Sequence, residues 1–256
     1  MRSHLIKLFA SAMFALSLSW SLAPSAFALD DAQKKVFGEF IREYLVENPE
    51  VLAEAQAVLE IRQAEAEVLR TQQIISNLSE DLYQTDGDII VGNPDGDVTI
   101  VEFFDYNCGF CKRAMEDMRE IIAQDSNVKF ILKEFPILGP ESTEASRVSL
   151  AVTRVAPEKS AEFHIALLGG SGRANAQKAM GIVNDLGIDQ AAVEKEMADD
   201  SLFDSLRTSY SLAESLGING TPAYVLANEA IFGAVGVPQI LSKIENIRKC
   251  GETTCS

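Results

Sequence analysis

The sequence predicts an α/β domain that carries a helical insertion and follows a helical N-terminal region. Two strongly apolar runs flank a helical pattern near the middle of the chain, a long stretch of purely helical periodicity follows, and two short strand-like runs come after it. With 47% hydrophobic residues, the chain of 256 residues is not a disordered or low-complexity protein. We predict an N-terminal helical region over 29–86 and an α/β domain over 87–256, with the insertion at about 141–217.

The first 28 residues have the order of a secretory signal peptide. Arg2 and Lys7 precede an uncharged apolar run, and the tripeptide Ala26-Phe27-Ala28 ends the segment. We therefore expect cleavage after Ala28 and export. The alternative is an uncleaved membrane anchor, although the apolar run is short for a membrane span.

The region over 29–86 is polar, with apolar residues at helical intervals. A short amphipathic helix is expected first, and Asn48-Pro49-Glu50 is typical of a helix start, with Asn48 as the N-cap. Along the second, long helix, apolar and small residues recur at steps of four and three: Ala57, Ile61, Ala64, Val68, Thr71, Ile75, Leu78 and Leu82. This spacing favours a homo-oligomer formed through residues 49–83. The alternative is that the stripe packs on the chain's own α/β domain.

The α/β domain begins at Asp88, where the helical spacing of apolar residues gives way to short strand-like apolar runs. Its expected strands cover 89–91, 98–104, 128–135, 223–226 and 230–233, with a helix from 112 to 122 and a closing helix over 238–248. The helical crossover predicts that strands 98–104 and 128–135 are parallel, and the last two strands are expected to form a hairpin.

The pattern Cys108-Gly109-Phe110-Cys111 lies where a strand ends and a helix begins. Unpaired backbone N–H groups and the helix dipole favour a thiolate there, so we expect Cys108 to be the attacking sulfur. Cys111, one turn further into the helix, is then the resolving sulfur. The alternatives are an inert local disulfide and a zinc site, and the zinc site lacks two further ligands nearby.

Composition narrows the other classes of function. The chain has 38 acidic and 22 basic residues, which disfavours nucleic acid as a partner. His164 is the only histidine beyond the signal segment, so a histidine-based triad or zinc site is not expected, and no cofactor or metal is predicted. Cys250 and Cys255 follow the last helix and are expected to form a structural disulfide. A second redox pair or a metal clip is the alternative for them.

The segment from Val98 to Cys111, with Gly220-Thr221-Pro222, resembles the thioredoxin fold, and the inserted helices make the chain similar to the bacterial DsbA-like branch over about 88–248. The resemblance implies a cis Thr221-Pro222 bond facing the cysteines. It also implies that Thr221, Pro222, Gly109 and Phe110 contact substrate, and that the protein acts in the periplasm.

In the DsbA-like branch a buried acid lies beneath the active-site disulfide, and Glu102 is at the matching position. A buried carboxylate of raised pKa can accept the proton of Cys111. The strand period places Glu102 on the same side as Ile100 and Phe104, which favours burial over the exposed alternative. Lys133 on the neighbouring strand is a weak candidate partner.

The motif Cys108-Gly109-Phe110-Cys111 lacks the histidine of strongly oxidising DsbA proteins. With Thr before Pro, it is similar to the DsbC-type isomerases and the ScsC branch, and the stretch from Tyr44 to Glu50 also resembles ScsC and Com1-like proteins. These similarities imply a thiol-disulfide isomerase or reductase that acts on exported client proteins with cysteines and is reset by a membrane redox partner. A DsbA-type dithiol oxidase and a copper(I)-binding protein that uses the same cysteines are the alternatives.

Overall fold

The computed structural model describes residues 30–83 and 87–255, so the predicted signal peptide lies outside the described residues. The chain divides into two compact units, residues 1–62 and 63–256. Within the first unit, helix α1 (Asp31–Glu47) has no buried residue. Helix α2 (Glu50–Asn77) begins in the first unit and ends in the second. The boundary between the units thus falls inside the predicted N-terminal region.

Helix α1 starts at a capping box in which Asp30 Oδ1 accepts from the Gln33 amide at 2.8 Å and Gln33 Oε1 accepts from the Asp30 amide at 3.1 Å. The prediction that Asn48 caps the start of α2 is wrong. Its side-chain amide donates to Tyr44 O at 2.9 Å, at the end of α1. The last carbonyl groups of a helix need donors, and the Asn48 amide supplies one there.

The apolar stripe of α2 changes its surroundings along the helix. Ile75 and, in helix α3 (Ser79–Tyr83), Leu82 are buried in the core of the second unit. Ile61 and Val68, further up the stripe, are 58% and 55% exposed. The C-terminal part of the stripe therefore packs on the chain's own α/β domain, whereas the apolar side chains further toward the N-terminus are exposed to solvent.

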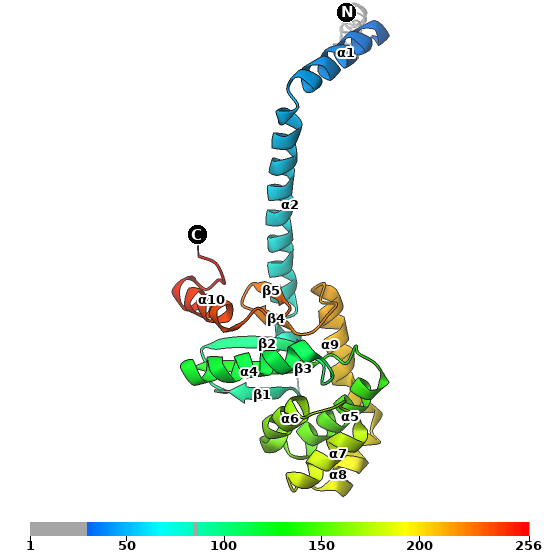
Figure 1. Ribbon diagram of the computed structural model, residues 1–256, viewed down its shortest axis with the longest axis vertical. Helices are drawn as coiled ribbons and strands as arrows, with labels where there is room; N and C mark the ends of the chain where they lie inside the picture. Colours follow the sequence, from blue (N-terminus) through cyan, green and yellow to red (C-terminus); the bar gives the residue numbers. More distant parts are fainter. Residues whose placement is uncertain (1–29, 84–86, 256) are drawn as a thin grey trace, which may run out of the picture. The chain divides into compact units, whose positions relative to one another are not determined.

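The five-stranded sheet has the order β1-β3-β2-β4-β5 (Figure 1). The strands are β1 (Ile89–Gly92), β2 (Val98–Phe104), β3 (Val128–Glu134), β4 (Ala223–Leu226) and β5 (Glu229–Phe232). Strands β2 and β3 are parallel and all other neighbours are antiparallel, which confirms the predicted crossover and the predicted hairpin.

Helices cover both faces of the sheet because the strands carry apolar residues on both sides. On one face, Ile100 and Phe104 pack with helices α4 (Gly109–Gln124), α6 (Ser160–Gly169) and α10 (Val237–Cys250). On the other face, Val101 and Phe103 pack with α3, the end of α2 and helix α9 (Asp204–Ser215). The cysteine pair at the start of α4 thus stands at the edge of a two-sided core.

The inserted region contains α5 (Pro140–Val155), α6, α7 (Ala176–Asp185), α8 (Gln190–Met197) and α9, with 3-10 turns at Pro157–Lys159 and Asp200–Phe203. No strand occurs between β3 and β4, as predicted. Figure 1 shows α5, α7 and α8 gathered at one end of the sheet. Within residues 30–83 and 87–255, no helix combines the length and apolar character that a bilayer crossing requires. The predicted α/β class with a helical insertion is confirmed.

Candidate active site

Cys108 is the N-cap of helix α4, and its extended backbone (φ −82°, ψ 117°) lets its side chain face the first helical amides. Its sulfur accepts from the Cys111 backbone amide at 3.4 Å. This arrangement follows from the local sequence. Strand β2 ends at Phe104, and three further residues turn the chain so that position 108 meets the open N-terminus of the helix.

The surroundings of Cys108 lower its pKa from an ordinary value near 9 to about 5. The hydrogen bond with the Cys111 side chain contributes most, and the Thr221 hydroxyl and the amides of Cys111 and Phe110 add to it. Partial burial acts in the opposite direction. Stabilisation of the anion wins, so Cys108 is a thiolate at neutral pH.

Cys111 has the opposite character. Its side chain is fully buried, and burial, followed by the hydrogen bond to Cys108, raises the pKa of its thiol far above the usual range. Both cysteines are free thiols in this structure. One sulfur is therefore ready to attack, whereas the other needs help to lose its proton.

The Thr221-Pro222 peptide bond is cis. It precedes β4 and faces the cysteine pair, because the Cys108 thiol lies 3.2 Å from Thr221 O. The family resemblance implied only substrate contact for Thr221, whereas its hydroxyl also lowers the pKa of the Cys108 thiol. Thr221 and Pro222 are more than a hundred positions away from Cys108 along the chain, so the spacing of the residues did not indicate this contact.

Glu102 is buried, with 3% of its surface exposed, on the α4 face of the sheet. Burial, followed by the charges of Asp117 and Cys108, raises the pKa of its carboxyl to about 8. Its charge in turn raises the pKa of Cys111. Only the ionised form of Glu102 can accept a proton, and the pKa of about 8 makes that carboxylate a stronger base than an ordinary one. Glu102 therefore has the properties of a proton acceptor for Cys111, and its ionised fraction grows as pH rises toward 8.

Lys133 is not the partner of Glu102. The strand register places Lys133 beside Phe103, and therefore on the opposite face of the sheet from Glu102. Its ammonium binds Asp88 at 2.7 Å. The prediction that Lys133 pairs with Glu102 is wrong because adjacent strands place two side chains on the same face only when the strand register allows it.

The dipeptide between the two cysteines is open to solvent. Gly109 is exposed, and Phe110 is 58% exposed with the Arg113 guanidinium 5.4 Å from its ring centre. No basic group of this dipeptide acts on the Cys108 thiolate. An exposed aromatic ring beside a reactive sulfur offers an apolar contact to a polypeptide substrate.

The second cysteine pair and the histidine lie elsewhere. Cys250 and Cys255 form a disulfide with an S–S distance of 2.11 Å. His164 is buried against the rings of Phe104 and Tyr106, and burial lowers its pKa to about 3, so it is neutral. Among the described residues, no group of three or more histidine, cysteine or acidic side chains is placed to hold a metal ion.

Two residues that sequence reasoning missed lie in the turn between β2 and Cys108. Asp105 and Asn107 form hydrogen bonds to the helical insertion, at Ser142 and Ala174. The one sequence signal was a pair of turn-forming residues between a strand and a helix, which is common in loops of every kind. Their partners lie 37 and 67 positions away along the chain.

Comparison with known proteins agrees with this geometry. Residues 99–245 match the DSBA-like thioredoxin domain family, and residues 33–66 match the Copper resistance protein ScsC N-terminal domain. A thioredoxin-like oxidoreductase from Silicibacter pomeroyi DSS-3 is 36% identical, with a TM-score of 0.63, and the alignment covers 67% of this chain and 98% of that one.

Two further solved structures extend the comparison. The thiol-disulfide exchange protein alpha-DsbA2 from Wolbachia pipientis is 29% identical, covering 71% of this chain and 98% of that chain, with a TM-score of 0.66. A linker-deletion mutant of Proteus mirabilis ScsC is 28% identical, covering 88% of this chain and 100% of that chain, also with a TM-score of 0.66.

A curated relative gives a partial match. Na(+)/H(+) antiporter NhaA 1 of Salinispora arenicola is 20% identical over 161 residues, and the chain spans 24% of that protein's length and uses 62% of its own. The thioredoxin-like sheet, the Cys-x-x-Cys pair at a helix start and the family match over 99–245 agree with one another. The chain therefore belongs to the DSBA-like thioredoxin domain family and is a thiol-disulfide oxidoreductase of ScsC-like type.

Proposed function

We propose that the protein is an exported isomerase or reductase of protein disulfides and not a strong oxidase. The surroundings of Cys108 carry this proposal: Gly109 and Phe110 supply no imidazolium, and uncharged donors lower the pKa of the thiol to about 5. A lower thiolate pKa makes the disulfide more oxidising, and the reference values are about 3.5 for DsbA and about 7 for thioredoxin. Cys108 lies between them because the Cys111 side chain, the Thr221 hydroxyl and two backbone amides, and no imidazolium, stabilise its charge.

The proposed reaction begins with the Cys108 thiolate. It attacks one sulfur of a client disulfide, forms a mixed disulfide and releases the other client sulfur as a thiolate. In isomerisation, a client thiolate then attacks the mixed disulfide, and Cys108 leaves again as a thiolate with no net change of electrons. In reduction, the ionised Glu102 carboxylate takes the proton of Cys111, and the Cys111 thiolate attacks the Cys108 sulfur of the mixed disulfide. The Cys108–Cys111 disulfide forms, the bond from Cys108 to the client breaks, and the client sulfur leaves as a thiolate, so the client gains two electrons.

The substrate side of the proposal rests on Thr221, Pro222, Gly109 and Phe110. The cis peptide bond presents the backbone before Pro222 next to the Cys108 sulfur, where an extended client segment can pair with it. Phe110 adds an exposed ring. We propose that these groups hold a client by backbone and apolar contacts, which suits clients of varied sequence.

An isomerase must hold its client while bonds rearrange, and several active sites in one oligomer raise the effective concentration of the second encounter. We propose that the first unit supplies this association. Large apolar side chains of α1 and of the part of α2 in this unit are exposed: Val36, Phe37, Phe40, Ile41, Tyr44, Val46, Leu52, Val58, Leu59 and Ile61. A helical segment with this much uncovered apolar surface is a candidate interface.

The test is a deletion of residues 30–62, which spares Ile75 and Leu82 in the core of the second unit. We expect the shortened protein to be monomeric and to reduce insulin as fast as the full chain, but to refold scrambled ribonuclease at a lower rate. Unchanged ribonuclease refolding would contradict an isomerase that depends on association. A glutathione titration that placed the Cys108–Cys111 couple at or above the DsbA potential of about −120 mV would contradict the direction of electron flow.

Periplasmic action and a membrane redox partner that resets Cys108 and Cys111 remain part of this proposal. The ScsC-type match adds copper(I) binding as a second candidate function, since two thiolates are soft ligands for that ion. One tightly bound copper(I) per reduced chain, without turnover of client disulfides, would favour the copper function over the enzyme.

A further inference from the structure

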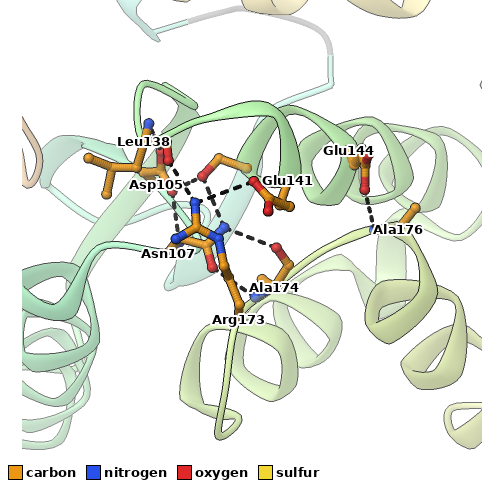
Figure 2. Close-up of polar contacts among 9 residues, drawn as sticks. Asp105, Asn107, Leu138, Glu141, Glu144, Arg173, Ala174 and Ala176 are labelled. Carbon is orange, nitrogen blue, oxygen red and sulfur yellow. Dashed lines mark hydrogen bonds and ion pairs between the residues drawn. The ribbon is translucent and has the colours of Figure 1, made fainter.

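The turn between β2 and Cys108 is tied down by the buried carboxylate of Asp105, which is 1% exposed. Its Oδ1 accepts from the Asn107 amide at 2.7 Å and from the Ser142 hydroxyl at 2.8 Å, and its Oδ2 accepts from the Leu138 amide at 2.9 Å. Three donors from two segments thus compensate the buried charge. Figure 2 shows Asp105 with Asn107 and Leu138, which supply two of these donors.

The side chain of Asn107 joins a third segment to this turn (Figure 2). Its Oδ1 accepts from the Ala174 amide at 2.8 Å, and its Nδ2 donates to Ala174 O at 3.0 Å. This two-way pairing is the one that a backbone peptide group would make. The same Nδ2 donates to Ser142 Oγ at 3.0 Å, so that hydroxyl bridges Asn107 and Asp105.

The segment that pairs with Asn107 has further bonds to the start of α5. The Arg173 guanidinium donates to Leu138 O at 3.0 Å and lies 3.3 Å from Glu141. The Ala176 amide lies 3.5 Å from Glu144. The loop between α6 and α7 and the beginning of α5 therefore act on the active-site turn as one body.

The same turn also sets the positions of both sulfurs. The Cys108 amide donates to Asp105 O at 3.0 Å, and the Asp105 backbone amide acts on the Cys111 sulfur and lowers its pKa. A turn that only connected a strand to a helix would need neither a buried carboxylate nor a side chain that mimics a peptide group. Here each of those bonds fixes backbone next to a reacting atom.

We propose that Asp105 and Asn107 are positioning residues through which the helical insertion sets the reactivity of Cys108. The hydrogen-bonded body formed by the turn 105–107, the start of α5 and residues 173–176 holds Cys108 against the open amides of α4. When this body loosens, the Cys108 sulfur loses part of its contact with the Cys111 amide. The thiolate then becomes less stable, and the disulfide becomes less oxidising.

The test uses Asn107→Ala and Ser142→Ala, with Ser160→Ala as the matched control. Ser160 is also a buried serine of the insertion, but its hydroxyl donates to Pro157 O, outside this network. We measure the pH dependence of Cys108 alkylation, the equilibrium with glutathione and the free energy of unfolding. If one hydrogen bond's stabilisation of the thiolate is lost, alkylation at pH 5 slows about threefold in both variants and remains unchanged in the control.

The outcomes separate positioning from simple stabilisation. If Asn107→Ala and Ser142→Ala unfold more easily but keep the wild-type alkylation profile and glutathione equilibrium, the network is only structural and the proposal fails. If Asn107→Ala does not fold, Ser142→Ala, which removes a single hydroxyl, decides the matter alone. The test needs only a reactive Cys108, so it is independent of whether the protein acts as an isomerase.

Discussion

The two cysteine pairs of this chain lie at opposite kinds of helix end. Cys108 caps the N-terminus of α4, where its sulfur faces backbone amides. Cys250 is the last residue of α10, where its sulfur lies 3.2 Å from Asn246 O. The N-terminus of a helix stabilises an anion and the C-terminus disfavours one. A cysteine is therefore favoured as an attacking thiolate at the start of α4 and as part of a stable disulfide at the end of α10.

The contacts beyond each helix end strengthen the difference. The Thr221 hydroxyl lowers the pKa of Cys108, and the buried Glu102 carboxyl interacts electrostatically with both cysteines. Beside the second pair, buried Thr253 donates to the Asn228 side chain in the β4–β5 turn. The first pair is thus surrounded by groups that stabilise a thiolate or accept a proton. The second pair lies where the C-terminal tail is bound to the β4–β5 hairpin.

The largest expected effect comes from removing the attacking sulfur. Cys108→Ser should lower insulin reduction by at least ~10³-fold, because the hydroxyl is not a thiolate nucleophile. Cys111→Ser should instead accumulate a mixed disulfide between Cys108 and client, visible on a non-reducing gel. Cys250→Ser with Cys255→Ser should keep wild-type turnover, and a large loss of turnover there would break the comparison.

Glu102→Gln should slow the resolving step by roughly 10²-fold at pH 7, since a general base typically contributes this much. In the wild type, resolution should accelerate as pH rises through the Glu102 pKa of about 8, and the variant should lose that rise. Stopped-flow decay of the mixed disulfide measures both. An unchanged pH profile would remove Glu102 from the mechanism.

Glu134→Gln is the matched control for Glu102→Gln. Glu134 is also a buried strand acid whose pKa burial raises to about 8, but serine hydroxyls of α5, and no cysteine, are its neighbours. Both folded carboxyls are neutral below pH 8, whereas the unfolded ones ionise near 4.5, so their burial costs stability as pH rises between these values. Each Gln variant should therefore be more stable than the wild type at pH 8, by at least ~1 kcal/mol in urea unfolding, and equally stable at pH 4. Only Glu102→Gln should change turnover.

The smallest expected effect on catalysis concerns the tail disulfide, whose loss should change stability alone. Its two cysteines are separated by 5 positions, and a loop this short restricts the unfolded chain by about 2 kcal/mol. Cys250→Ser with Cys255→Ser should lose about that much unfolding free energy and leave the Cys108–Cys111 potential unchanged. A shifted potential would show that the second pair takes part in redox chemistry.

Local patterns in the sequence predicted much of this molecule. The apolar runs gave β2 and β4 with their correct bounds, and strand alternation placed Glu102 on the buried α4 face. The end of a strand beside Cys-x-x-Cys placed Cys108 at the helix start. In each case the residues that decide the structure are neighbours along the chain, so the pattern contains the necessary information.

The features that were missed depend on contacts between distant segments. The Asn48 side chain turned back to α1, and the α2 stripe divided at the point where the domain core begins to cover it. The Thr221 hydroxyl and the Asn107 pairing with Ala174 join residues that no local pattern relates. Periodicity predicts which face of an element is apolar, but not which distant segment covers it.

The most direct test of the account is the rate of Cys108 alkylation by iodoacetamide as a function of pH, followed by mass spectrometry of the reduced protein. The account predicts a rate that rises with a midpoint near pH 5 at Cys108 and almost no reaction at buried Cys111 below about pH 9. A midpoint near the value of an ordinary free thiol, about 8.5, would contradict it, because Cys108 would then gain nothing from its place at the start of α4.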